Sequence, residues 1–277
     1  MSRISDRFAA LRQAGRGGLI PFITAGDPDR DTTARLLAGL PAAGADLIEL
    51  GLPFSDPMAD GPAIQEASER ALKAGASTAR TLDLVREFRE TDTTTPVVLM
   101  GYYNPVFVHG PERFARDAAA AGVDGIILVD LPPEEADEFT GPARAAGLDF
   151  IVLTAPTTDD ARLPRVLANA GGFVYYVSVA GVTGTRAAEG TTIRDAVDRL
   201  RRFTDLPLAV GFGIRTPDQA AEVAAAADAA VVGSAVIGRI ADNLDADGRP
   251  APGLVDDTLR FVGELAAGVR KQRGEAP

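Results

Sequence analysis

The sequence predicts an α/β fold, a single-domain (β/α)8 barrel or TIM barrel, and two observations support that prediction. Short apolar runs alternate with helical segments along the whole chain, and eight such runs occur within 277 residues. An open doubly wound sheet has fewer strands and a glycine-rich turn after the first one, whereas no G-x-G-x-x-G follows the first run here. A closed barrel therefore fits the pattern better than an open sheet.

The eight runs are almost continuously apolar and rich in β-branched residues. This pattern is typical of parallel strands that are covered on both faces. The predicted strands are Leu19–Thr24, Asp46–Leu50, Pro96–Met100, Gly125–Val129, Phe150–Leu153, Phe173–Val177, Leu208–Val210 and Ala229–Val232.

The segments between these runs are rich in Ala, Arg and Glu and place apolar residues at helical spacing. They are Thr32–Leu40, Ile64–Lys73, Thr81–Glu90, Pro111–Ala121, Pro133–Ala146, Arg162–Ala170, Ile193–Phe203 and Pro217–Ala226. Two helical segments, Ile64–Lys73 and Thr81–Glu90, follow the second apolar run, and a short one, Ala235–Ile240, follows the eighth. Before the first run, Met1–Gln13 has the pattern of an amphipathic helix. We therefore expect an extra N-terminal helix and short extra helices after strands 2 and 8. Residues 1–277 form one predicted domain, with a frayed tail over Arg270–Pro277.

Three of the helices are predicted to end in the same way. Ala43–Asp46, Ala121–Asp124 and Ala146–Asp149 each place a glycine after the helix, followed by an apolar residue and an aspartate. Glycine closes helices because it adopts the left-handed backbone conformation without strain. This repeat predicts architecture and not chemistry.

Composition excludes several functional classes. The net charge is −11, from 28 basic and 39 acidic residues, and the longest basic cluster is Arg199–Arg202, so we expect no nucleic-acid partner. With no cysteine and the single histidine His109, the chain offers no thiolate nucleophile and no Cys/His metal centre. The charged segment Met1–Gln13 does not resemble a secretory signal, and no apolar run approaches about 18 residues. We expect a cytoplasmic protein without a membrane span.

A carboxylate interrupts the second apolar run. Glu49 lies within Asp46–Gly51, and Asp60 follows eleven positions later, beyond a loop punctuated by prolines. Burying an unpaired ionised carboxylate costs on the order of several kcal/mol or raises its pKa, so Glu49 is the first candidate for chemistry. The alternative for Glu49 is a salt bridge to a neighbouring Lys or Arg. For Asp60, which precedes Gly61 and Pro62, the alternative is capping of the next helix.

Glycine-rich segments follow the last three predicted strands. They are Gly181–Thr185, Gly211–Gly213 and Gly233–Ser234. The active site of a TIM barrel lies at the C-terminal ends of its strands, and phosphate binds near the last ones. Backbone N–H groups at glycines and at a helix N-terminus can hold a phosphate without a basic cluster. Each segment alone could be a turn, but together they predict a phosphate site.

Four stretches of the chain resemble the α subunit of tryptophan synthase, and the resemblance extends essentially from end to end. They are Pro21–Pro28, Glu49–Pro62, Ala180–Gly184 and Gly211–Ile214. The resemblance implies retro-aldol cleavage of indole-3-glycerol phosphate to indole and glyceraldehyde 3-phosphate without a cofactor. It implies that Glu49 moves protons between the glycerol hydroxyl and indole C3. Asp60 would hold the indole N–H, and Tyr175 would lie close to Glu49 and the glycerol chain.

The same resemblance implies the binding contacts. The indole pocket would be lined by Phe22, Leu99, Tyr102, Leu128, Leu153 and Phe212. The phosphate would be bound by Gly184, Gly213, Gly233 and Ser234. Thr183, in the loop Val179–Gly190, would meet Asp60 when that loop closes and excludes water. Val179 stands where one branch of the family has arginine, which bears on loop closure. For Tyr102 and Tyr175, filling of the barrel is an equal alternative.

The family works as an α2β2 complex, in which a β subunit with pyridoxal phosphate receives indole through a tunnel. This implies a β partner that contacts the loop Pro53–Ala59 and the region of Asn104, and no cofactor in this chain. Two alternatives stay open: a stand-alone indole-3-glycerol-phosphate lyase that releases free indole, and a barrel that has lost catalysis and serves as a scaffold. The intact pair Glu49 and Asp60 counts against the scaffold.

Overall fold

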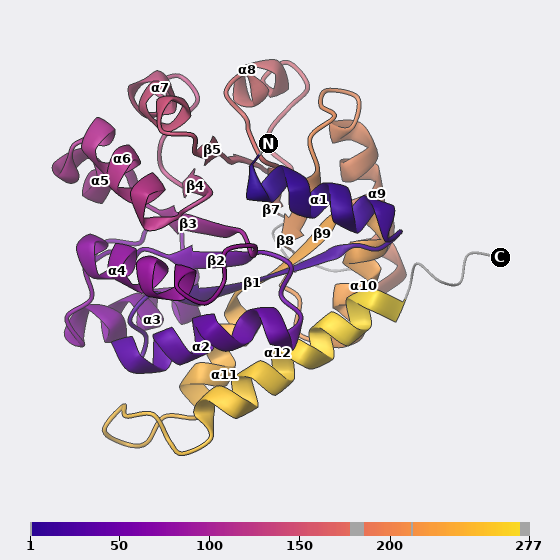
Figure 1. Cartoon of the computed structure of the whole chain (residues 1–277). Helices are drawn as coiled ribbons and strands as arrows, with labels where there is room; N and C mark the ends of the chain where they lie inside the picture. The colour runs from indigo at the N-terminus through magenta and orange to yellow at the C-terminus, as the bar shows by residue number, and fades with distance from the viewer. Residues whose placement is uncertain (1, 178–185, 212, 272–277) are drawn as a thin grey trace.

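The computed structural model confirms the barrel and describes residues 2–177, 186–211 and 213–271. Its strands are all parallel and form one sheet in the order β5-β4-β3-β2-β1-β9-β8-β7-β6, which curls into a barrel (Figure 1). The strands are β1 Gly18–Thr24, β2 Ile48–Gly51, β3 Val97–Gly101, β4 Gly125–Leu128, β5 Asp149–Phe150, β6 Val152–Thr154, β7 Val174–Val177, β8 Leu208–Gly211 and β9 Ala229–Val232.

The helices surround the sheet, and the long C-terminal helix α12 lies beside α2 (Figure 1). The helices are α1 Arg3–Gln13, α2 Arg30–Ala43, α3 Pro62–Lys73, α4 Thr78–Arg89, α5 Tyr103–His109, α6 Pro111–Ala121, α7 Asp137–Ala145, α8 Leu163–Leu167, α9 Arg186–Leu200, α10 Pro217–Ala226, α11 Ser234–Asp242 and α12 Leu254–Lys271. In the part of the chain that the structure describes, no helix is long and apolar enough to cross a membrane.

The extra helices are confirmed: α1 precedes the barrel, two helices follow β2, and α11 follows β9 before α12. Two helices were not delimited from the sequence. The seven-residue α5 carries Pro105 within it and is too short to display a helical period. The other is α12, which extends to Lys271 and so includes the first two residues of the tail predicted to fray.

The predicted fifth strand is divided in the structure. Its first part, β5, pairs with β4, and its second part, β6, pairs with β7 on the other side. Ile151 lies between the two parts, and its N–H still donates to the Ile126 carbonyl at 2.9 Å. One strand therefore joins both edges of the sheet and closes the barrel.

Strand register decides which side chains point into the barrel. Glu49 on β2 is in register with Phe22 on β1 and with Val98 on β3. Val98 belongs to the hydrophobic cluster of the barrel interior, which also contains Ile4 and Phe8 of α1. In a parallel sheet, side chains in register project from the same face. Glu49 therefore projects into the barrel interior. Helix α1 covers the end of the barrel at which the strands begin.

Aspartates at the starts of three strands hold the N-terminal end of the barrel together. Each accepts a backbone N–H from the start of the neighbouring strand: Asp46 from Leu19 at 3.0 Å, Asp124 from Val97 at 2.8 Å, and Asp228 from Leu208 at 2.9 Å. Two of them, Asp46 and Asp124, come from the Gly-x-Asp repeat. Its glycines Gly44, Gly122 and Gly147 have φ values of 105°, 94° and 80°, which confirms the predicted helix ends.

Candidate active site

Glu49 is a buried carboxyl group on β2 that projects into the barrel interior. Only 1% of the residue is exposed, and its Oε2 atom has no hydrogen-bond partner among the described residues. Burial, followed by the charge of Asp60, raises the pKa of Glu49 to about 8. The alternative considered for Glu49, a salt bridge to a Lys or Arg side chain, is not found among the described residues. At neutral pH the group is mostly protonated and can donate a proton.

Asp60 is held at the mouth by a tyrosine. The Tyr102 hydroxyl lies 3.1 Å from Asp60 Oδ2 and donates to it, and the same hydroxyl accepts the Ala59 N–H at 2.9 Å. Helix α3 has Gly61 as its N-cap, without a side-chain hydrogen bond, so Asp60 does not cap it. Burial raises the pKa of Asp60, and the Tyr102 hydrogen bond lowers it. The charge of Asp60 is the second cause of the raised pKa of Glu49, after burial.

Tyr175 lies across the barrel interior from β2. Burial and then the charge of Glu49 raise the pKa of Tyr175 well above its ordinary value, which indicates that the two groups are close. A Cβ atom on Gly211 would lie 2.5 Å from the Tyr175 hydroxyl, so only glycine at this position leaves room for the ring. Gly211, which the sequence predicts to belong to a phosphate-binding segment, thus also leaves space for Tyr175.

Two of the residues predicted to contact indole, Leu99 and Leu128, point away from the barrel interior. Leu99 is in register with Leu50 and Ile126, and Leu128 is in register with Gly101. Both leucines belong to the cluster packed between strands and helices. Since successive side chains alternate across a strand, a residue next to an inward-facing position faces outward. Leu99 and Leu128 therefore do not face the barrel interior.

The residues that follow them in the chain, Met100 and Val129, face the barrel interior instead. Met100 and Val129 pack against the interior cluster, as does Leu153, which is in register with Tyr175. Phe22 is in register with Glu49 and faces the same space. The strands are apolar on both faces, so hydrophobicity could not identify the inward face. Counting in steps of two from Glu49 across the register would have selected Met100.

The phosphate segment is described only in part. Gly213 has φ 60°, and Gly233 is the N-cap of α11, whose first residue is the exposed Ser234. The first N–H groups of a helix have no partner within it, so the start of α11 offers donors to an anion. The remaining predicted residues Val179, Thr183, Gly184 and Phe212 lie outside the described residues.

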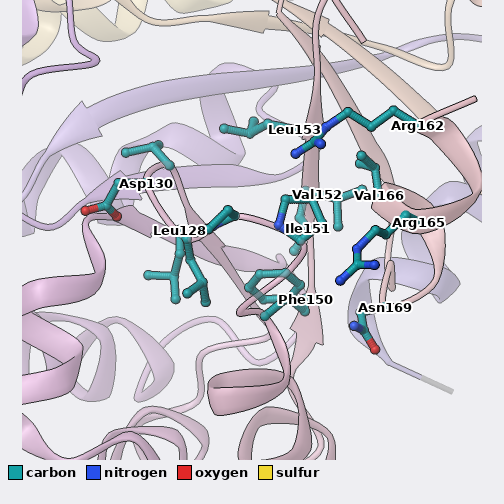
Figure 2. Close-up of a pocket in the computed structure, with 15 residues that line it drawn as sticks. Leu128, Asp130, Phe150, Ile151, Val152, Leu153, Arg162, Arg165, Val166 and Asn169 are labelled. Atoms are coloured by element: carbon teal, nitrogen blue, oxygen red, sulfur yellow. The ribbon is translucent and has the colours of Figure 1, made fainter. Parts of the chain in front are cut away.

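The cavity in Figure 2 is a different space. It has a volume of about 260 Å³ and lies between β4, β6 and α8. Arg162 and Arg165 line one side and Leu128 the other (Figure 2). Neither Glu49 nor Asp60 lines it. Val129 and Leu153, which face the barrel interior, also line the cavity, so it adjoins that interior while neither carboxyl group belongs to its lining.

Comparison with known sequences identifies the family. The model of the tryptophan synthase alpha chain family matches residues 8–256. The tryptophan synthase alpha chain of Acidiphilium cryptum is 58% identical over 276 residues, which cover 100% of both chains. That of Granulibacter bethesdensis is 59% identical over 273 residues, which cover 99% of this chain and 98% of the relative.

Solved structures agree with this assignment. Tryptophan synthase subunit alpha from Legionella pneumophila str. Paris has a TM-score of 0.89 and 41% sequence identity, covering 97% of this chain and 98% of that one. Tryptophan synthase from M. tuberculosis in its aminoacrylate-bound form has a TM-score of 0.84 and 34% identity, covering 97% and 100%. The chain therefore belongs to the tryptophan synthase alpha chain family, whose members are enzymes of tryptophan biosynthesis.

Proposed function

We propose that this chain is a carbon–carbon lyase that cleaves indole-3-glycerol phosphate to indole and glyceraldehyde 3-phosphate. The observation that carries the proposal is the buried Glu49, with its pKa near 8, at the same barrel mouth as Asp60 and Tyr175. A carboxyl group that changes its protonation state near neutral pH can act first as an acid and then as a base.

The bond to be broken joins indole C3 to the hydroxyl-bearing carbon of the glycerol chain. Protonated Glu49 donates its proton to indole C3, which places positive charge on the ring nitrogen. The resulting carboxylate then accepts the proton of the glycerol hydroxyl. The carbon–carbon bond breaks, its electron pair returns to the ring, and the former hydroxyl becomes the aldehyde. Glu49 ends protonated, so it is ready for the next turnover.

Asp60 has the complementary task in this proposal. The ring N–H becomes more acidic when C3 is protonated, and an ionised carboxylate that accepts its hydrogen bond stabilises that intermediate. Burial raises the pKa of both groups, to about 8 for Glu49, and the Tyr102 hydrogen bond lowers that of Asp60, so the proposal gives the charged role to Asp60. The environments of the two carboxyl groups thus separate their roles.

The start of α11 supplies the proposed phosphate site. Gly233 lacks a side chain, and the backbone N–H groups of the first turn of α11, with the Ser234 hydroxyl, can donate to phosphate oxygens. Gly213 would add a backbone N–H from the neighbouring strand end. The negative net charge of the chain does not oppose this, since such a site depends on local donors.

We propose a β subunit as the partner, with pyridoxal phosphate confined to that subunit. Apolar side chains are exposed at both of the predicted contact regions. Met58, in the loop Pro53–Ala59, is 78% exposed, and Phe107 and Val108 on α5 are 61% and 77% exposed. Helix α5 contains Asn104, and exposed apolar groups of this kind mark protein contact sites. The partner would receive the indole.

The proposal is tested by steady-state indole release from indole-3-glycerol phosphate, with and without a β subunit. We expect slow release by the chain alone and strong stimulation by β. High unaided turnover without stimulation would instead support a stand-alone lyase. Absence of turnover under both conditions would overturn the proposed reaction.

A further inference from the structure

We propose that Tyr102 is a positioning residue: its hydroxyl holds the Asp60 carboxylate in the ionised form and ties it to the end of β3. This differs from the indole contact that sequence predicts for Tyr102. The inference rests on the proposed function, in which Asp60 must be charged to stabilise the indole nitrogen.

The hydrogen-bond geometry defines what the hydroxyl can do. The Ala59 N–H donates to Tyr102 Oη at 2.9 Å, so the oxygen is an acceptor there. Its one hydrogen is left for Asp60 Oδ2 at 3.1 Å. A carboxylate accepts such a hydrogen bond better than a carboxylic acid does. The pair of bonds therefore favours the charged form of Asp60.

Tyr102 is itself fixed on several sides. Only 2% of the residue is exposed, it follows directly after β3, and its ring packs on Phe54 with centroids 5.2 Å apart. Phe54 and Ala59 lie near the two ends of the loop that leads to Asp60. Gln65 Nε2 donates to the Asp60 carbonyl at 2.8 Å, which holds the backbone but not the carboxylate. Among the described residues, the Tyr102 hydroxyl is the group that hydrogen-bonds the Asp60 carboxylate.

The other titratable groups at this corner of the described structure do not supply a positive charge. Asp60 raises the pKa of Glu49, and the charge of Asp130 acts on the pKa of Tyr102. Asp56, in the same loop, is exposed and bonded to Ser55. All three are carboxyl groups, so none of them favours the charged form of Asp60, and burial of Asp60 opposes that form. The hydroxyl of Tyr102 is the interaction that acts in the other direction.

The test is the pH profile of kcat/KM for indole release by Tyr102→Phe, measured in the complex with β and compared with the unaltered protein. Removing one hydrogen bond to a charged group should move the low-pH limb upward by about one pH unit or more. Tyr103→Phe is the matched control. The Tyr103 hydroxyl also binds a carboxylate, Glu138, at 2.9 Å, but away from Asp60. With β at a saturating concentration, the low-pH limb of Tyr103→Phe should therefore stay where it is in the unaltered protein.

A direct readout does not depend on activity. Carboxyl carbon NMR of protein labelled at aspartate, with the Asp60 signal assigned by its loss in Asp60→Asn, gives the pKa of Asp60 in each variant. A higher pKa in Tyr102→Phe supports the inference. The inference would be overturned if Tyr102→Phe raised KM but left both the low-pH limb of kcat/KM and the pKa of Asp60 unchanged. Tyr102 would then be an indole contact only. If the unaltered protein releases no indole, the proposed reaction fails, while the NMR titration still decides the role of Tyr102.

Discussion

Glu49 occupies a strand position where its neighbours in register, Phe22 and Val98, are apolar. Its raised pKa follows from the loss of water around the carboxyl group and from the nearby charge of Asp60. The same feature that makes the residue costly to bury gives it a proton to exchange near neutral pH. Its chemistry and its energetic penalty therefore have one cause.

Replacing Glu49 by Gln should abolish turnover while substrate binding survives. The amide keeps the size of the side chain but cannot donate and accept a proton in turn, so we expect a loss of at least about 10²-fold in kcat. Indole release and equilibrium binding of substrate measure the two effects separately. A variant that keeps most of its rate would contradict the assigned role.

The same substitution should stabilise the protein increasingly as the pH rises. The pKa of Glu49 is about 8 when folded, against 4.5 for the ordinary group. Between these pH values the unfolded chain releases the proton and the folded chain keeps it. The free energy of unfolding of the unaltered protein therefore falls by about 1.4 kcal/mol for each unit by which the pH rises. Thermal unfolding of both proteins at pH 5 and pH 8 should show a widening difference in Tm. An equal difference at both pH values would argue against the raised pKa.

The reaction should have a bell-shaped dependence on pH. Activity requires protonated Glu49 and ionised Asp60, so kcat/KM should fall above about pH 8, as Glu49 loses its proton. It should also fall at low pH, as Asp60, whose pKa lies above its ordinary value, becomes protonated. The measurement is kcat/KM across the range in which the fold is intact by circular dichroism. A rate that stays level through pH 9 is incompatible with Glu49 as the initial acid.

At the scale of elements, the sequence predicted most strands and helices closely. The bounds of α6, α10 and β9 agree with the prediction, because Pro or Gly marks their ends or their apolar runs are sharply delimited. The division of the fifth strand was not predictable. It depends on which neighbour each half pairs with, and that is a property of the closed sheet.

The aspartates at the strand starts should be important for stability. Asp124→Ala would leave Arg89, whose side chain is 10% exposed, without its carboxylate and would leave the Val97 N–H unpaired. We expect a loss of about 3–5 kcal/mol in the free energy of unfolding, measured by denaturant titration. The matched control is Asp83→Ala, which removes the exposed ion pair with Arg86 and should cost about 1 kcal/mol or less. Similar losses in the two variants would contradict the role given to Asp124.

For the whole molecule, three of the four exposed large apolar side chains of the described residues, Met58, Phe107 and Val108, lie in the segments that follow β2 and β3. Phe107→Asp should weaken stimulation by the β subunit without changing unaided indole release, because it places a charge in the proposed interface. Titration of activity with β measures the apparent affinity, for which we expect a loss of about tenfold or more. Ala9→Asp is the control: Ala9 is exposed on α1 at the opposite end of the barrel. An unchanged titration for Phe107→Asp would exclude this face as the contact.

The sequence by itself determined the barrel, the two carboxyl groups and the family. These depend on local patterns: apolar runs of strand length, glycines that end helices, and a carboxylate where packing does not call for one. The tertiary structure alone decided which strand residues face the interior: Met100 and Val129 face it, and Leu99 and Leu128, the predicted indole contacts, do not. It also joined Tyr102 to Asp60, which lie 42 positions apart. Such choices depend on strand register and barrel closure, which no segment of the chain specifies alone.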